Sequence, residues 1–133
     1  MIEKKMLLKL KQLFPYIMFQ SIETSTTLGF PDVIYGHADT IGFIELKELN
    51  RIPVRKFTVP WRPGQLAWYT DYKSKYKNKS PYLLIITLKD SWYFISSIKE
   101  SYSMMEANVY YIGETKDLNY TKDRIIHVLF PTN

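Results

Sequence analysis

The sequence contains no cysteine, and only two of its 133 residues are histidines. The lack of cysteine excludes disulfide bonds, thiolate catalysis and zinc sites built on cysteine, and it agrees with a reducing compartment. His37 and His127 stand far apart in the chain, unlike the closely spaced histidines of a metal motif. We therefore expect no structural zinc, and we place neither histidine in a functional site.

Long apolar runs are also missing. No stretch of about eighteen apolar residues occurs, and Lys9 and Lys11 interrupt the N-terminal segment where a signal peptide would have its hydrophobic core. We therefore expect an intracellular protein that does not enter a membrane. The length of 133 residues suits one domain, 1–133, which would bury roughly two thirds of the surface exposed by the unfolded chain.

The chain is basic and rich in aromatic residues. It has 18 Lys and Arg against 13 Asp and Glu, a net charge of +5, and 16% aromatic residues. This mixture suits binding to a polyanion such as nucleic acid, but it is also common in other small proteins. Composition alone therefore leaves the function open.

The first half of the chain alternates between helical and strand-like patterns. Apolar residues spaced by three and four predict a helix that ends before Pro15. Strands are predicted next within 16–23, 31–36 and 40–49, and three strands in succession indicate an antiparallel meander. A loop through Pro53 and Pro60 then leads to a second helix within 62–77, where Pro63 can occupy the first helical position.

The second half supplies the centre of the predicted sheet. The uninterrupted apolar run 82–88 predicts a buried strand, and the turn 89–91 joins it to a strand at 92–95. The segments 97–113 and 124–130 offer a short helix or irregular connection and one or two more strands. The pattern predicts an α/β fold with a central mixed β-sheet flanked by helices.

The strand at 40–49 carries an acid and a lysine two residues apart. Alternate residues of a strand share a face, so Glu45 and Lys47 point the same way while Ile44 and Leu46 point into the core. We expect these charged side chains, together with that of Asp32, on an exposed face. If the strand at Asp32 pairs antiparallel with this one, its carboxylate approaches that of Glu45.

Two neighbouring carboxylates need a cation. Mg²⁺ is commonly bound by one or two carboxylates, water and substrate phosphate, so Asp32, Glu45 and the backbone carbonyl of Leu46 form a candidate metal site. Lys47 could position the attacking water and neutralise charge that develops on a phosphate. A plain surface ion pair is the alternative, because such spacings and Pro-Asp pairs at turns are both abundant.

The order of elements adds to these motifs. The chain contains the pair Pro31-Asp32 and, with Glu45 thirteen residues after Asp32, the motif Glu45-Leu46-Lys47. In these motifs and in the order of its elements it resembles the PD-(D/E)xK nuclease superfamily over residues 1–95. The stretch "RPGQLAWY", with Gln65 followed three residues later by Trp68, resembles the VRR-NUC and phage-type branch of Holliday-junction-resolvase-like proteins. The Val-Arg-Arg signature of that branch is absent.

The resemblance implies a restriction-endonuclease-like core of order α-β-β-β-α-β and a Mg²⁺ or Mn²⁺ cofactor. It implies that Asp32 and Glu45 are metal ligands, Lys47 the catalytic lysine and Gln65 an accessory residue. A further acid on the first helix is usual in the superfamily, and Glu3 is our candidate, with Glu23 as its competitor. The resemblance also implies a homodimer that acts on branched DNA. It further implies a role in replication, recombination or repair, in a virus among other settings.

Basic residues near these motifs are candidate DNA contacts. Four of them lie in the loop that precedes Gln65, and three follow on the second helix, where they form either a solvated helix end or a strip that meets backbone phosphates. They are Arg51, Arg55, Lys56 and Arg62 in the loop, and Lys73, Lys75 and Lys77 on the helix. Trp68 is expected to pack rather than to stack on bases.

The sequence thus predicts a metal-dependent endodeoxyribonuclease. Because no base-reading motif is visible, we expect it to select DNA by structure rather than by sequence. The alternative is a catalytically inactive nuclease fold that binds nucleic acid or a protein partner. A decayed nuclease tends to lose an acid or the lysine, and all three residues are present here.

Overall fold

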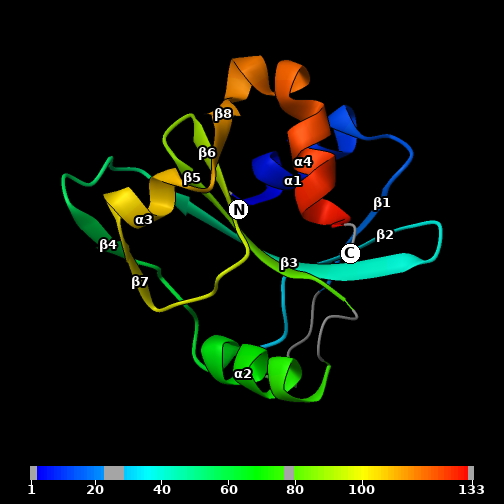
Figure 1. Cartoon of the computed structure of the whole chain (residues 1–133), viewed down its shortest axis with the longest axis horizontal. Coiled ribbons are helices and arrows are strands. Elements are labelled where there is room, and N and C mark those ends of the chain that lie inside the picture. Colours follow the sequence, from blue (N-terminus) through cyan, green and yellow to red (C-terminus); the bar gives the residue numbers. More distant parts are fainter. Residues whose placement is uncertain (1–2, 23–28, 77–79, 132–133) are drawn as a thin grey trace.

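A computed structural model describes residues 3–22, 29–76 and 80–131. Figure 1 shows the helices and strands of this part of the chain. They are α1 (Glu3–Leu13), β1 (Met18–Ser21), β2 (Val33–His37), β3 (Thr40–Leu49), β4 (Lys56–Thr58), α2 (Gln65–Lys75), β5 (Tyr82–Leu88), β6 (Ser91–Ile95), β7 (Ser101–Ser103), α3 (Met104–Asn108), β8 (Tyr111–Glu114), the 3-10 helix η1 (Thr115–Thr121) and α4 (Lys122–Leu129).

The main sheet has six strands in the order β1-β2-β3-β5-β6-β8. Strands β1, β2 and β3 form the predicted antiparallel meander, and β5 and β6 form the predicted hairpin. Helix α2 carries the chain over from β3 to β5, so these two central strands run parallel, with Leu46 opposite Ile85. The predicted fold class, a mixed sheet flanked by helices, is confirmed.

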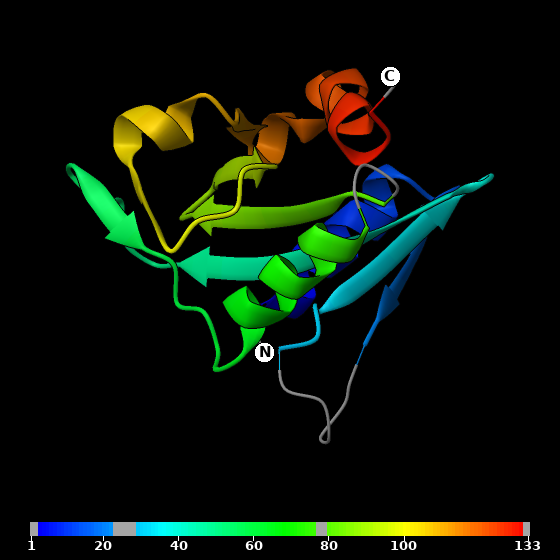
Figure 2. The same cartoon turned by 60° about the horizontal axis from the view of Figure 1, so that its bottom comes forward.

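Both faces of the sheet are covered. One face packs on α1 and α4 through a core that includes Leu10, Ile44 and Leu129. Helix α2 lies on the opposite side, beside a small projecting unit formed by β4, β7 and α3, as Figures 1 and 2 show. Since β5 lies between two strands and under both layers, all seven of its residues are buried, which explains its uninterrupted apolar sequence.

Three expectations from the sequence need correction. The segment 51–62 is not only a loop, because β4 pairs antiparallel with β7. Helix α2 begins at Gln65 behind Gly64, whose positive φ of 86° precedes the first helical turn, and not at Pro63. The two further strands, β7 and β8, lie within 101–114, whereas 124–130 belongs largely to α4, which buries Ile125 and Leu129 one turn apart.

No helix of the described ranges combines the length and the apolar character needed to cross a bilayer.

Candidate active site

Glu45 and Lys47 of β3 face α2 and are buried. Glu45 has no exposed surface and Lys47 is 7% exposed, so the expected exposed strand face is wrong. Helix α2, the segment that leads into it and the β4–β7 unit cover this side of the sheet. Asp32, whose side chain is 22% exposed, lies at the border with solvent. The cluster therefore opens to solvent on the Asp32 side.

Asp32 and Glu45 hold each other in place through the backbone. The Asp32 N–H donates to Glu45 Oε1 across 3.1 Å, and the Leu46 N–H donates to Asp32 Oδ2 across 3.2 Å. This exchange follows from the antiparallel register, in which Val33 lies opposite Ile44 and Asp32 comes one residue before the β2 ladder. The predicted approach of the two carboxylates is confirmed.

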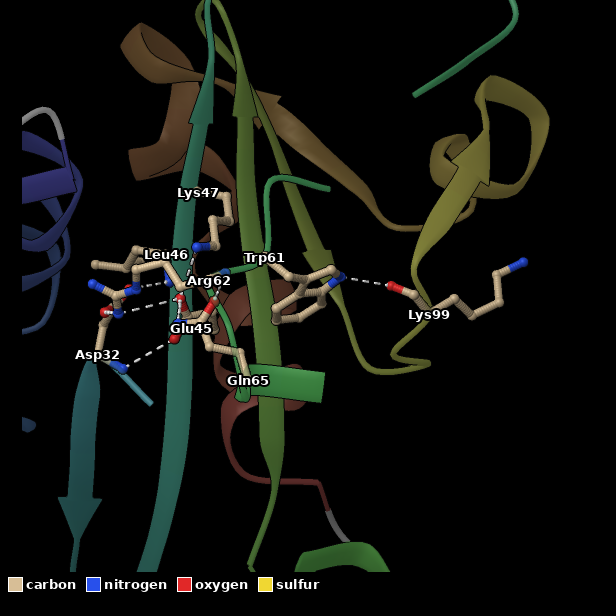
Figure 3. A network of polar contacts seen from close by, with 8 residues as sticks. All are labelled: Asp32, Glu45, Leu46, Lys47, Trp61, Arg62, Gln65 and Lys99. Atoms are coloured by element: carbon tan, nitrogen blue, oxygen red, sulfur yellow. Dashed lines mark hydrogen bonds and ion pairs between the residues drawn. The ribbon is translucent and has the colours of Figure 1, made fainter. Parts of the chain in front are cut away.

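The other oxygen of Glu45 is held by side chains. Gln65 Nε2 donates to Glu45 Oε2 across 2.5 Å, and Lys47 Nζ lies 3.1 Å from the same oxygen. The Gln65 Oε1 accepts a hydrogen bond of 2.7 Å from the Arg62 N–H, so both ends of this buried amide are satisfied. Gln65 therefore fixes the orientation of Glu45 relative to α2 (Figure 3).

Arg62 joins the carboxylates from the solvent side. One of its terminal nitrogens lies 2.6 Å from Asp32 Oδ1 and 3.9 Å from Glu45 Oε2. The sequence placed Arg62 among the phosphate contacts of the loop, and no sequence signal indicated this second position. Trp61 lies beside it, with its ring centroid 6.0 Å from Lys47 Nζ and its indole N–H donating to the Lys99 carbonyl across 3.1 Å (Figure 3).

Two glycines bring the separate segments together. A Cβ at Gly29 would lie 2.1 Å from the Gly64 carbonyl oxygen, and the two residues have φ of 84° and 86°. Only glycine adopts such backbone angles without strain, and only glycine permits this approach. The contact places the segment before Asp32 against the start of α2, so that Asp32 and Gln65 reach Glu45 together.

Burial and charge perturb the titration of the site. Burial, and after it the charge of the Asp32 carboxylate, raise the pKa of the Glu45 carboxyl to about 7, although the Lys47 ammonium acts in the opposite direction. Tyr82, which is 4% exposed, has a hydroxyl with no hydrogen-bond partner in the described residues. Burial, followed by the charges of Glu45 and Asp32, raises the pKa of this phenol. Tyr82 was not predicted as a site residue, because its position in an apolar strand carries no signal of a polar role.

The other candidate residues lie apart from this cluster. Glu3 begins α1, and among the described residues no three Asp, Glu, His or Cys side chains form a group that could hold a metal, so Glu3 does not join the two acids. Glu23 and Lys77 fall outside the described residues. Trp68 packs as expected, 5.6 Å from Phe43 between ring centroids.

The other candidate DNA contacts within the described residues are exposed, as Arg62 itself is. Arg51, Arg55 and Lys56 follow β3 and lead into the β4–β7 unit. Lys73 and Lys75 lie in the last turn of α2, where Lys75 pairs with Asp71 at 2.9 Å. They form two separate basic regions on the surface.

The geometry can be compared with known proteins. No protein-family model matches the chain, and no curated protein sequence matches it. Among solved structures, the fold is similar to that of Hjc, a Holliday junction resolvase of the archaeal hyperthermophile Archaeoglobus fulgidus. The TM-score is 0.53 at 14% sequence identity, and the match covers 87% of this chain and 98% of that chain. The chain therefore has a fold similar to that of a junction resolvase.

Proposed function

We propose that this protein is a divalent-metal-dependent endodeoxyribonuclease that hydrolyses phosphodiester bonds in branched DNA. The observation that carries the proposal is the convergence of Asp32, Glu45 and Lys47 on the face of the sheet that α2 covers, with both carboxylates oriented by backbone N–H groups. The fold similarity to a Holliday junction resolvase supports the choice of substrate.

The donor set fits a hard cation. Asp32 and Glu45 supply carboxylate oxygens, which Mg²⁺ and Mn²⁺ prefer. The Leu46 N–H donates to Asp32, and the N–H and C=O of one residue in an extended strand point to the same side. In this proposal the Leu46 carbonyl would therefore be a third oxygen donor. An ion held there would polarise the scissile phosphate and supply a nucleophilic water at neutral pH.

The chain's own residues prepare the reaction. Gln65 keeps Glu45 from rotating away, because the amide is bonded at both ends. Lys47 Nζ, 3.1 Å from Glu45 Oε2, would donate a hydrogen bond to the attacking water or to a phosphate oxygen. A donor fixed before the reaction stabilises the developing negative charge without reorganisation, which is its main advantage over solvent.

The DNA path in this proposal runs over the two basic regions. Arg51, Arg55 and Lys56 would contact phosphates on one side of the site, and Lys73 and Lys75 on the other. Contacts of this kind position a duplex without reading bases, which agrees with selection by DNA structure. The proposal includes a homodimer, which the resemblance to junction-resolving nucleases implies.

Incubation of the full chain with four-way junction, flap, nicked and linear DNA tests the proposal. We expect strand cleavage of a branched substrate with Mg²⁺ or Mn²⁺, and binding with little turnover in Ca²⁺, whose looser coordination positions water poorly. Asp32→Asn serves as the inactive control, and light scattering of the same samples gives the oligomeric state.

Two results would count against the proposal. Undiminished cleavage in excess EDTA would remove the metal mechanism. Tight, salt-sensitive DNA binding without cleavage in any divalent ion would favour the inactive nucleic-acid-binding module instead.

A further inference from the structure

Arg62 places a positive charge on the same oxygens that the proposed ion would use. Its guanidinium contacts Asp32 Oδ1 at 2.6 Å and lies 3.9 Å from Glu45 Oε2. We infer that Arg62 is a resident counter-cation of the carboxylates, which leaves them when a divalent ion binds and then becomes available to a DNA phosphate. The inference rests on the proposed function, because it assumes that Asp32 and Glu45 hold the ion.

Among the groups that contact the two acids, Arg62 is the one that can be exchanged at low cost. Backbone N–H groups hold Asp32 Oδ2 and Glu45 Oε1, and they cannot leave without breaking the β2–β3 arrangement. Gln65 and Lys47, which hold Glu45 Oε2, are almost completely buried. The Arg62 side chain is 58% exposed, so water can replace its contacts when it moves away.

The ion and the guanidinium cannot occupy the site together. Asp32 is the more exposed of the two acids, and Arg62 donates directly to its Oδ1. A divalent ion on this oxygen would place two positive charges about 4 Å from the guanidinium, a repulsion that the partly solvated surroundings screen only in part. Metal entry therefore requires that Arg62 move outward.

When Arg62 moves away from the carboxylates, it moves toward the solvent side, where DNA would bind. Arg62 belongs to the segment that leads into α2, and its side chain, which is 58% exposed, lies beside Asp32 (Figure 3). A phosphate at the site would attract the released guanidinium, which forms strong, often bidentate contacts with phosphate oxygens. Binding of DNA and binding of the ion would thus favour each other, with Arg62 as the shared element.

Titration of the DNA-free full chain with Mn²⁺ in a calorimeter tests the inference without any measurement of activity. Four proteins are compared: the wild type, Arg62→Gln, Lys116→Gln and Glu45→Gln. Lys116 is exposed on η1, so its replacement removes the same charge away from the site. We expect Arg62→Gln to bind Mn²⁺ about tenfold more tightly than the wild type, because a competing cation is gone. Lys116→Gln should stay within about twofold of the wild type.

The outcomes separate this inference from the proposed function. Equal Mn²⁺ affinity of the wild type and Arg62→Gln, with binding lost in Glu45→Gln, would overturn the inference and leave the nuclease proposal standing. Mn²⁺ binding that Glu45→Gln does not reduce, or no binding to any of the four proteins, would overturn both. Equal tightening in Lys116→Gln would assign the effect to net charge and would also overturn the inference. Circular dichroism of each variant confirms that it is folded.

Discussion

Gln65 donates a hydrogen bond of 2.5 Å to Glu45 and so ties the first residue of α2 to the middle of β3. The same amide accepts the Arg62 N–H, and Gln65 is only 1% exposed. The bond is therefore a structural link between two elements as well as a support for the candidate metal ligand.

Replacement of Gln65 by Ala should weaken both the fold and the site. The change leaves a buried carboxylate oxygen and a backbone N–H with fewer partners, which should lower the free energy of unfolding by about 2 kcal/mol or more. Urea unfolding in EDTA measures this loss. Gln12→Ala, on the exposed side of α1, is the matched control and should change stability by less than about 0.5 kcal/mol. Similar values for the two variants would contradict the role given to Gln65.

Asp32→Asn should separate chemistry from folding. It removes a charge from the proposed metal shell but retains the side chain's size, so turnover should fall by roughly 10²- to 10³-fold. Because Asp32 lies at the solvent border, the melting temperature should change by only a few degrees. Asp39→Asn, in the exposed turn before β3, should leave both quantities unchanged. An active but unstable Asp32→Asn would end the assignment of the site.

Lys47→Ala should behave differently from Asp32→Asn. Lys47 is buried beside Glu45, so its removal takes the nearest cation from a buried carboxylate and opens space behind it. Loss of one partner of a buried pair costs about 3 kcal/mol when the other stays charged, and less when Glu45 takes up a proton. We expect cleavage to stop and the urea midpoint to fall. Unchanged stability would show that solvent reaches Lys47 freely.

Local patterns were sufficient for the elements that form the centre of the fold. The alternation in 40–49 and the apolar run in 82–88 predicted β3 and β5, and the Pro-Asp and Glu-x-Lys motifs placed Asp32 next to Glu45. These features depend on neighbouring residues and on the pairing of two strands that follow each other in the chain, which sequence patterns indicate well.

Features set by distant segments were not predicted. The burial of Glu45 depends on α2 and on the β4–β7 pair, whose strands have three residues each and meet only through long-range pairing. The position of Arg62 depends on the backbone turn at Gly64 and on a contact with Gly29. The segment 124–130 is short and contains β-branched residues, so its sequence is compatible with a strand or a helix. It forms most of α4 because the helix packs its apolar residues on the core.

The loop after β3 should account for part of the salt dependence of DNA binding. Each phosphate contact releases counterions, so Arg51→Ala and Arg55→Ala should each lower the slope of log affinity against log salt by about one. Fluorescence anisotropy between low and moderate salt, in Ca²⁺ to prevent turnover, provides the slopes. Lys116→Ala is the control and should leave the slope unchanged. If both arginine variants keep the wild-type slope, the DNA does not cross this loop.

Two buried tyrosines should respond in opposite ways to the loss of a hydroxyl. The Tyr35 hydroxyl donates a hydrogen bond of 2.5 Å to the Leu129 carbonyl near the end of α4, whereas the Tyr82 hydroxyl has no partner in the described residues. Both side chains are almost fully buried, at 0% and 4% exposure, so replacement by Phe removes the same atom from similar surroundings.

Tyr35→Phe should therefore lower the free energy of unfolding by about 1–2 kcal/mol, since the Leu129 carbonyl loses a buried donor. Tyr82→Phe should leave it unchanged or raise it by up to about 1 kcal/mol, because an uncompensated polar group is removed from the interior. Urea unfolding of both variants in EDTA, at one pH, gives the comparison without any contribution from bound metal. Equal losses in the two variants would contradict this expectation and would show that the Tyr82 hydroxyl has a hydrogen-bond partner in solution, such as a buried water molecule.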